Sequence, residues 1–273
     1  MTVIHEFLTR LGSADAILVR VHSHRGSVPR EAGAWMAVFA QSSVGTIGGG
    51  HLEWQASAQA RAQLQGQPIE SPQRFALGPS LGQCCGGDVL LRFERVSAAD
   101  IARLQADLTQ QQQAWPQVAL FGAGHVGQAL VRVLAHLPLQ VHWVDSRDEV
   151  FPLPLPDTVS TEHSQPVQMA VTSLRPDTMV LVMSFSHAED LDVVAACLTR
   201  QRAQADLAFI GLMGSRTKWA SFSHRLLARG FTPAELAQVT CPIGLAGIVG
   251  KAPDVIAVSV AAQLLQVVSQ RTT

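Results

Sequence analysis

The sequence contains no block of like charges. Its 273 residues include 20 basic and 21 acidic side chains, and charged residues make up only 15% of the chain. A nucleic-acid-binding surface needs a basic patch or stripe. The charge pattern therefore excludes nucleic acid from the expected partners.

Long apolar runs are absent as well. The longest, residues 255–268, is interrupted by Ser259, Gln263 and Gln266 and is too short to cross a bilayer. The first twelve residues have no basic segment followed by an apolar run, so they predict a helix rather than a secretion signal. We therefore expect a cytoplasmic protein without membrane association, in which cysteines stay reduced.

Cysteine is scarce, with four residues and no C-x-x-C pair. Adjacent Cys84 and Cys85 can be bridged only through a strained ring, and two neighbouring thiols are poor joint ligands for zinc. They lie in L-G-P-S-L-G-Q-C-C-G-G (77–87), where glycines allow conformations that a Cβ forbids. One interpretation is two small buried residues. The glycines favour the other, accessible thiols that bind a thiophilic metal centre or carry sulfur.

A second glycine-rich segment, G-T-I-G-G-G-H-L-E (45–53), leads into a helix predicted over 51–64. Successive N–H groups in such a loop can form a nest for phosphate. His51 and Glu53 fall in the first helical turn, where they can face the same ligand. Two interpretations remain open, a ligand cradle and a tight strand-to-helix turn with an incidental histidine.

The apolar content of 47% is sufficient for a sizeable core, and the pattern divides the chain in two. Residues 1–112 predict a smaller α+β domain, with strands over 15–22, 35–39 and 89–96. The polar segment 109–113 is the expected linker. Residues 113–273 alternate between strands and helices, which predicts an α/β domain with a Rossmann-like, doubly wound parallel sheet. The expected strands there are 118–121, 140–144, 179–184 and 207–210.

The segment F-G-A-G-H-V-G (121–127) has the G-x-G-x-x-G spacing between a predicted strand and helix. Gly122 would allow the tight turn, Gly124 the approach of a phosphate, and Gly127 the packing of the helix on the sheet. Asp145 ends the next strand, where an acid commonly bonds a ribose hydroxyl. A nucleotide in this crevice is expected, with a purely structural Rossmann fold as the alternative. Arg147 could meet an extra phosphate.

One further cluster, at residues 187–190, contains side chains that could act in acid–base catalysis. H-A-E-D at 187–190 has acid–base groups, but such a run is more typical of the first turn of a helix. No catalytic residue is assigned.

Taken in order, these motifs resemble the XdhC/CoxI family, and the resemblance covers nearly the whole chain. The segments that carry it are S-V-P-R-E-A-G-A-W-M (27–36), 45–53, 77–87, 121–127 with V-D-S-R (144–147), G-L-M-G-S-R-T-K (211–218) and C-P-I-G-L (241–245). The first three are specific in combination, whereas the Rossmann motif alone is not.

The resemblance implies a non-enzymatic accessory protein. It would bind the molybdenum cofactor (molybdopterin), protect it while a cysteine desulfurase helps to install sulfur, and insert it into the molybdenum subunit of xanthine dehydrogenase. It also implies a homodimer. Cys84 or Cys85 would sit beside molybdenum or relay sulfur. The expected cofactor-binding residues are Gly48, Gly49, Gly50, His51, Glu53, Gly82, Gln83, Cys84, Cys85, Gly86, Gly87, Gly122, Gly124, Gly127 and Asp145.

Three other functions remain open. An NAD(P)-dependent oxidoreductase would explain the Rossmann motif but gives no reason for the C-C-G-G segment. A CoxI-like maturation factor would serve another molybdenum hydroxylase. A thiol redox sensor would depend on Cys84 and Cys85 without binding cofactor.

Overall fold

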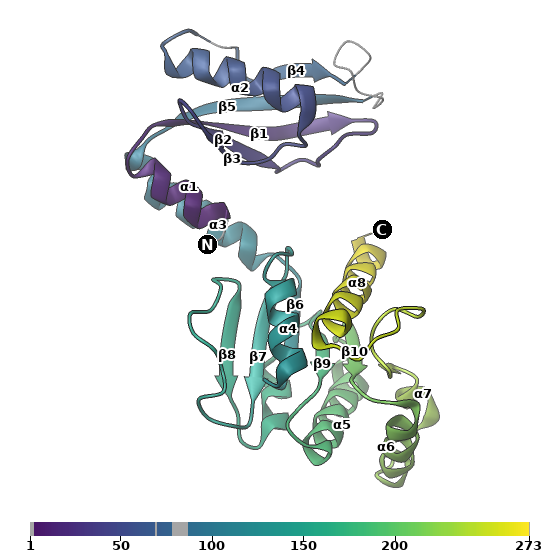
Figure 1. Ribbon diagram of the computed structural model, residues 1–273. Coiled ribbons are helices and arrows are strands. Elements are labelled where there is room, and N and C mark those ends of the chain that lie inside the picture. The colour runs from purple at the N-terminus through teal and green to yellow at the C-terminus, as the bar shows by residue number, and fades with distance from the viewer. Residues whose placement is uncertain (1–2, 69, 78–86, 273) are drawn as a thin grey trace. The chain divides into compact units, whose positions relative to one another are not determined.

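The computed structural model describes residues 3–68, 70–77 and 87–272 (Figure 1). The chain divides into two compact units, residues 1–110 and 111–273. None of the helices in these described ranges combines the length and apolar character that a membrane span requires.

The first unit is built on an antiparallel sheet of order β3-β2-β1-β5-β4. In the central strand, Leu18 pairs with Ala37 on β2 and with Glu94 on β5. The elements of this unit are α1 (Val3–Leu11), β1 (Ala16–Arg25), β2 (Trp35–Val38), β3 (Ser43–Gly45), α2 (Gly50–Leu64), β4 (Gln73–Ala76), β5 (Asp88–Val96), η2 (Ala98–Asp100) and α3 (Ile101–Gln113).

Alternation along β1 gives this sheet two apolar faces. Ile17 and Val19 share a buried cluster with Leu52 of α2, whereas Leu18 packs in another cluster with Phe7 of α1 and Leu104 of α3. Helix α2 therefore covers one face, and α1 and α3 cover the other (Figure 1). Because successive side chains of a strand point to opposite faces, one strand supplies both clusters.

The division between the two units falls at residues 110 and 111, inside the predicted linker 109–113, and the structure adds that this segment is helical. Helix α3 continues through residues 109–113 and ends at Gln113. Glutamine has a high helix propensity, and a helix already begun by buried Leu104 and Leu108 needs no further apolar stripe to continue.

The second unit contains a parallel sheet of order β8-β7-β6-β9-β10-β11. The strand order reverses between β6 and β9, as in a Rossmann fold. The elements are β6 (Gln117–Phe121), α4 (His125–Leu134), β7 (Gln140–Asp145), β8 (Val159–His163), η3 (Val167–Ser173), β9 (Met179–Val182), α5 (His187–Gln204), β10 (Phe209–Leu212), α6 (Arg216–Ala228), α7 (Pro233–Leu236), β11 (Val239–Thr240) and α8 (Pro253–Thr272).

Helices cover both faces of this sheet. Leu130 of α4 and Val260 of α8 pack with Leu120 on one face. Val194 of α5 and Phe222 of α6 belong to the cluster that contains Phe121 on the other. The predicted fold class, a Rossmann-like parallel sheet with an N-terminal α+β domain, is confirmed.

Candidate functional site

The glycine-rich segment 45–53 forms a tight loop ahead of α2. Gly48 has φ +123°, and a Cβ there would overlap the ring of Pro29. Gly49 and Gly50 also have positive φ, and α2 begins at Gly50. The glycines therefore let this loop lie against the neighbouring segment around Pro29.

The carboxylate of Glu53 turns back onto its own loop. Its Oε1 accepts hydrogen bonds from the backbone N–H groups of Ile47 (2.9 Å) and Gly49 (2.8 Å) and from the hydroxyl of Thr46. Burial pushes the pKa of Glu53 upward, but these hydrogen bonds outweigh it and the pKa is lowered from its ordinary value. Glu53 thus occupies donors that a bound phosphate was expected to use.

His51 does not share this arrangement. It is exposed, its Nε2 lies 3.2 Å from Gln55 Nε2, and its ring centroid lies 5.3 Å from that of Trp54. Trp54 is 66% exposed. The structure therefore separates Glu53, which bonds the loop, from an exposed aromatic pair that sequence reasoning missed. The only signal was a tryptophan three positions after the histidine on a helix.

Gly87, at the end of the cysteine segment, lies close to the segment around Ser27. Gly87 is buried, its carbonyl oxygen accepts from Leu77 N (2.8 Å), and a Cβ there would lie 2.5 Å from the carbonyl oxygens of Arg25 and Ser27. Ser27 and Pro29 belong to one segment, so that segment touches both Gly87 and Gly48. The other predicted residues of this motif lie outside the described residues: Gly82, Gln83, Cys84, Cys85 and Gly86.

In the second unit, the G-x-G-x-x-G segment forms the turn from β6 into α4. Gly122 has φ +117°, and a Cβ there would overlap the carbonyl oxygen of Met183. A Cβ on Gly127 would overlap the carbonyl oxygen of Gly122, which also accepts from Trp143 Nε1 (3.0 Å). Gly124 is the N-cap of α4, and no side chain caps the helix there. The turn at Gly122 and the close packing at Gly127 follow the prediction, whereas the approach of a phosphate to Gly124 stays a prediction.

Asp145 is committed to neighbouring groups of its own chain. Its side chain is 1% exposed, Oδ2 accepts from Ala123 N (2.6 Å) and Arg147 Nη2 (2.9 Å), and Oδ1 accepts from Arg147 N (3.0 Å) and Nε (2.9 Å). Burial raises the pKa of Asp145, but the bonds from Arg147 and Ala123 prevail and lower it. The carboxylate therefore holds the glycine loop, and does not face a ribose as expected.

A cavity of about 300 Å³ opens beside this loop. Its lining residues come from the start of α4 and from the segments after β7, β9 and β10: Gly124, His125, Val126, Gly127, Arg147, Met183, Ser184, Phe185 and Met213. Ligands of open α/β sheets bind at this position, outside the carboxyl ends of the strands where the strand order reverses.

The H-A-E-D run helps to shape the cavity. Asp190 accepts from Ser184 N (2.7 Å) and from Lys218 Nζ (2.6 Å), and Lys218 also donates to Met213 O (2.9 Å). Glu189 N donates to Ser186 Oγ, the N-cap of α5. These residues therefore join the segments after β9 and β10 at the sheet edge, in agreement with a structural role for the first turn of the helix.

Two cysteines lie in the described part of the chain. Burial raises the pKa of Cys197 to about 12, and burial also raises the pKa of half-buried Cys241, whose Sγ lies 3.6 Å from Gly214 O. Within the described ranges, no three His, Cys, Asp or Glu side chains are grouped to hold a metal ion. Neither thiol is therefore activated as a nucleophile.

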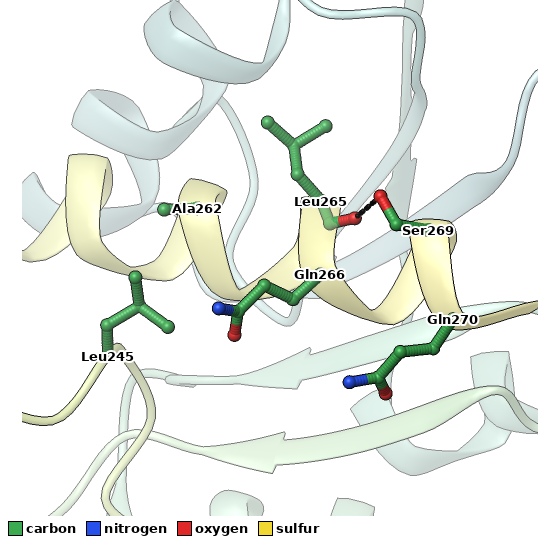
Figure 2. Close-up of a pocket in the computed structure, with 6 residues that line it drawn as sticks. All are labelled: Leu245, Ala262, Leu265, Gln266, Ser269 and Gln270. Atoms are coloured by element: carbon green, nitrogen blue, oxygen red, sulfur yellow. Dashed lines mark hydrogen bonds between the residues drawn. The ribbon is translucent and has the colours of Figure 1, made fainter.

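A different hollow of about 480 Å³ runs along α8 (Figure 2). Leu245 lies opposite Ala262, and the hydroxyl of Ser269 donates to the carbonyl oxygen of Leu265 (2.9 Å). The other lining residues are Gln266 and Gln270. Since none of the six is charged, this hollow offers apolar area but no group that would orient a phosphate.

Known protein families match both units. The model of the XdhC Rossmann domain matches residues 118–264, and the model of the XdhC and CoxI family matches residues 12–74. The Escherichia coli (strain K12) protein YqeB, described as uncharacterized, is 28% identical over 256 residues, which are 92% of this chain and 43% of YqeB. The chain thus spans less than half the length of this curated relative.

A solved structure shares the fold. A Bacillus halodurans protein described as a xanthine dehydrogenase superposes with a TM-score of 0.76 at 20% identity, over 99% of this chain and 97% of that one. At this identity the likeness concerns architecture, which extends across nearly the full length of both chains.

Proposed function

Because this chain belongs to the XdhC family, we propose that it carries the molybdenum cofactor. Membership of this family suggests a role in the maturation of xanthine dehydrogenase. The protein binds the cofactor, protects it while a cysteine desulfurase supplies sulfur, and inserts it into the molybdenum subunit of xanthine dehydrogenase. It acts as a cytoplasmic homodimer and as an accessory protein rather than a catalyst.

The packing of three motif segments supports this proposal. Pro29 lies against Gly48, and the Ser27 carbonyl lies against Gly87, where the segment with Cys84 and Cys85 ends. Gly87 and the glycine loop therefore both lie against one stretch of chain, residues 25–30. A maturation factor needs such an arrangement, because sulfur chemistry and cofactor binding must occur at the same place.

The residues at the start of α2 suit part of the cofactor. When bound, the cofactor supplies a phosphate, a pterin ring system and a dithiolene that holds molybdenum. Glu53 occupies the N–H groups of Ile47 and Gly49, so an anion would use the following N–H groups in the first turn of α2, which no side chain caps. His51 and exposed Trp54 offer aromatic surface for a flat ring. Cys84 and Cys85 are the proposed sulfur ligands or relays.

Cofactor content is the first test. The protein is purified anaerobically from cells that make molybdenum cofactor, and molybdenum is measured by mass spectrometry and oxidised pterin by fluorescence. We expect pterin and molybdenum in near-stoichiometric amounts. Absence of both, even after reconstitution with free cofactor, would refute the carrier function.

A glycine variant tests whether the converging segments bind the cofactor. Gly48→Ala places a Cβ against Pro29 and should lower the pterin content severalfold. Gly66→Ala is the matched control, because Gly66 also has positive φ (+92°) but no neighbouring atom near its Cβ position. Equal pterin content in the two variants would contradict the proposed location.

The thiols are tested by separate Cys84→Ser and Cys85→Ser variants. Each is loaded with cofactor and mixed with apo xanthine dehydrogenase, and the recovered activity is measured. We expect at least one variant to lose delivery of active cofactor. Normal binding and delivery by both would exclude the thiols from the function.

A further inference from the structure

The crevice of the second unit has donors for a phosphate group. Helices α5, α6 and α7 are capped by the hydroxyls of Ser186, Ser215 and Thr232, whereas α4 begins at Gly124 without a side-chain cap. The first N–H groups of α4 therefore remain available at the wall of the cavity.

Ser184 belongs to the same wall of the cavity. Ser184 lines the cavity, and its Oγ is buried without a hydrogen-bond partner among the described residues. Its N–H is already held by Asp190 Oδ1, which fixes the backbone at this point. The Oγ itself has almost no accessible surface, so Ser184 contributes to the shape of the cavity wall rather than a hydrogen bond to a ligand.

The ribose end of the crevice differs from that of an NAD site. A ribose with free hydroxyls needs an accepting carboxylate at the end of β7. Both oxygens of Asp145 already accept two hydrogen bonds each, and the side chain is 1% exposed. The expected acceptor is therefore unavailable.

Arg147 presents its charge in place of that acceptor. Its side chain is 35% exposed, it lines the cavity, and it lies 4.6 Å from the ring centroid of Phe185. Nε and Nη2 bind the buried Asp145, so Nη1 and the outer face of the guanidinium point away from that pair. Arginine in this position suits a ribose phosphate, which accepts paired hydrogen bonds.

Two carboxylates close to the cavity are bonded within the protein. Asp190 bonds Lys218, and Glu189 Oε1 accepts from Ser146 Oγ (2.7 Å). Glu189 Oε2 is buried, so Arg147 is the exposed charge of the cavity lining.

We infer that this crevice binds a dinucleotide whose ribose carries an additional phosphate, of the NADP type, in preference to its unphosphorylated NAD counterpart. The N–H groups at the start of α4 bind the bridging phosphates, and Arg147 binds the ribose phosphate. This binding does not depend on the carrier function, and no hydride transfer is implied.

Direct titration of the full chain tests the inference. Calorimetry with NADP⁺ and NAD⁺ should give an affinity for NADP⁺ that is about tenfold higher or more, since hydrogen bonds to charged groups commonly contribute that much. The isomers 2′-AMP and 5′-AMP carry the same charge, and 2′-AMP should bind more tightly. Equal affinities, tighter binding of NAD⁺, or no binding of either dinucleotide would overturn the inference.

Variants then locate the selectivity. Arg147→Gln should lower the affinity for NADP⁺ to that for NAD⁺, whereas Arg225→Gln, an exposed position on α6, should preserve the preference. The wild-type comparison decides the inference even if Arg147→Gln folds poorly. Pterin content is measured on the same preparation, so failure of the carrier function and failure of nucleotide binding give different results.

Discussion

The two units each place a glycine-rich loop before a helix, and in both a carboxylate bonds the N–H groups of the loop. In the first unit, Glu53 comes from the helix that the loop precedes, and only Oε1 accepts the bonds. In the second, Asp145 comes from the neighbouring strand and uses both oxygens, and Arg147 pairs with it.

This difference shows that one local motif can be stabilised in two ways. Glu53 is a near neighbour in sequence, so the first loop is organised mainly by local contacts. Asp145 joins β7 to the turn after β6, so the second loop depends on the packed sheet. The second loop should therefore be the more sensitive to substitution, which four measurements can test.

The largest effect should come from Gly122→Ala. The new Cβ would overlap the Met183 carbonyl, and φ at this position is +117°. We expect a loss of about 3–5 kcal/mol in the free energy of unfolding, because backbone strain and a clash with the backbone just after β9 combine. Denaturant titration measures it. Gly230→Ala, with φ +85° and no atom near the Cβ position, should lose only about 1–2 kcal/mol.

Asp145→Asn should cause the second-largest loss in the free energy of unfolding. An amide cannot accept from all four donors and leaves Arg147 without its counter-charge, so we expect a loss of about 2–3 kcal/mol. Asp148→Asn is the control, because Asp148 is 80% exposed and its pair with His163 contributes at most about 1 kcal/mol. Similar losses in both variants would mean that the buried pair does not hold the loop.

Glu53→Gln should have a smaller effect. The amide oxygen can still accept from Ile47 and Gly49, so only the charge is lost, and we expect about 1 kcal/mol from denaturant titration. The exposed loop residue Glu31 supplies the control variant, Glu31→Gln. A loss as large as that of Asp145→Asn would contradict the contrast between the two loops.

The smallest expected effect is the dependence of the free energy of unfolding on pH. Both carboxyl pKa values are lowered by folding, so their contribution is complete above the unfolded values near 4 and is lost as pH falls through the folded values. The stability gap between wild type and Asp145→Asn should therefore narrow as pH falls below about 5. A gap that widens on acidification would mean that Asp145 is protonated in the folded state.

Much of the fold could be predicted from the sequence, because it depends on periodic burial. Alternating strands and helices identified the parallel sheet, and the spacing of Gly122, Gly124 and Gly127 located its turn. Strand β8 was missed because it is an edge strand whose sequence, V-S-T-E-H, is mostly exposed and has no apolar run.

The candidate site was less predictable, since side-chain partners depend on rotamers and on distant segments. Glu53 was expected to face a ligand and instead bonds its own loop. Asp145 occupies the predicted position at the strand end, but its partner Ala123 could not be inferred from local sequence. The roles proposed for Cys84 and Cys85 stay predictions.

For the proposed carrier function, the two carboxylates that bond the glycine loops would also bear on the rates at which a ligand is loaded and released. Since Glu53 and Asp145 satisfy loop N–H groups within the chain, neither loop depends on a ligand for those hydrogen bonds. Association then requires little ordering of backbone, and dissociation leaves the same hydrogen bonds intact. A protein built in this way can accept and surrender a cargo repeatedly without passing through a partly unfolded form.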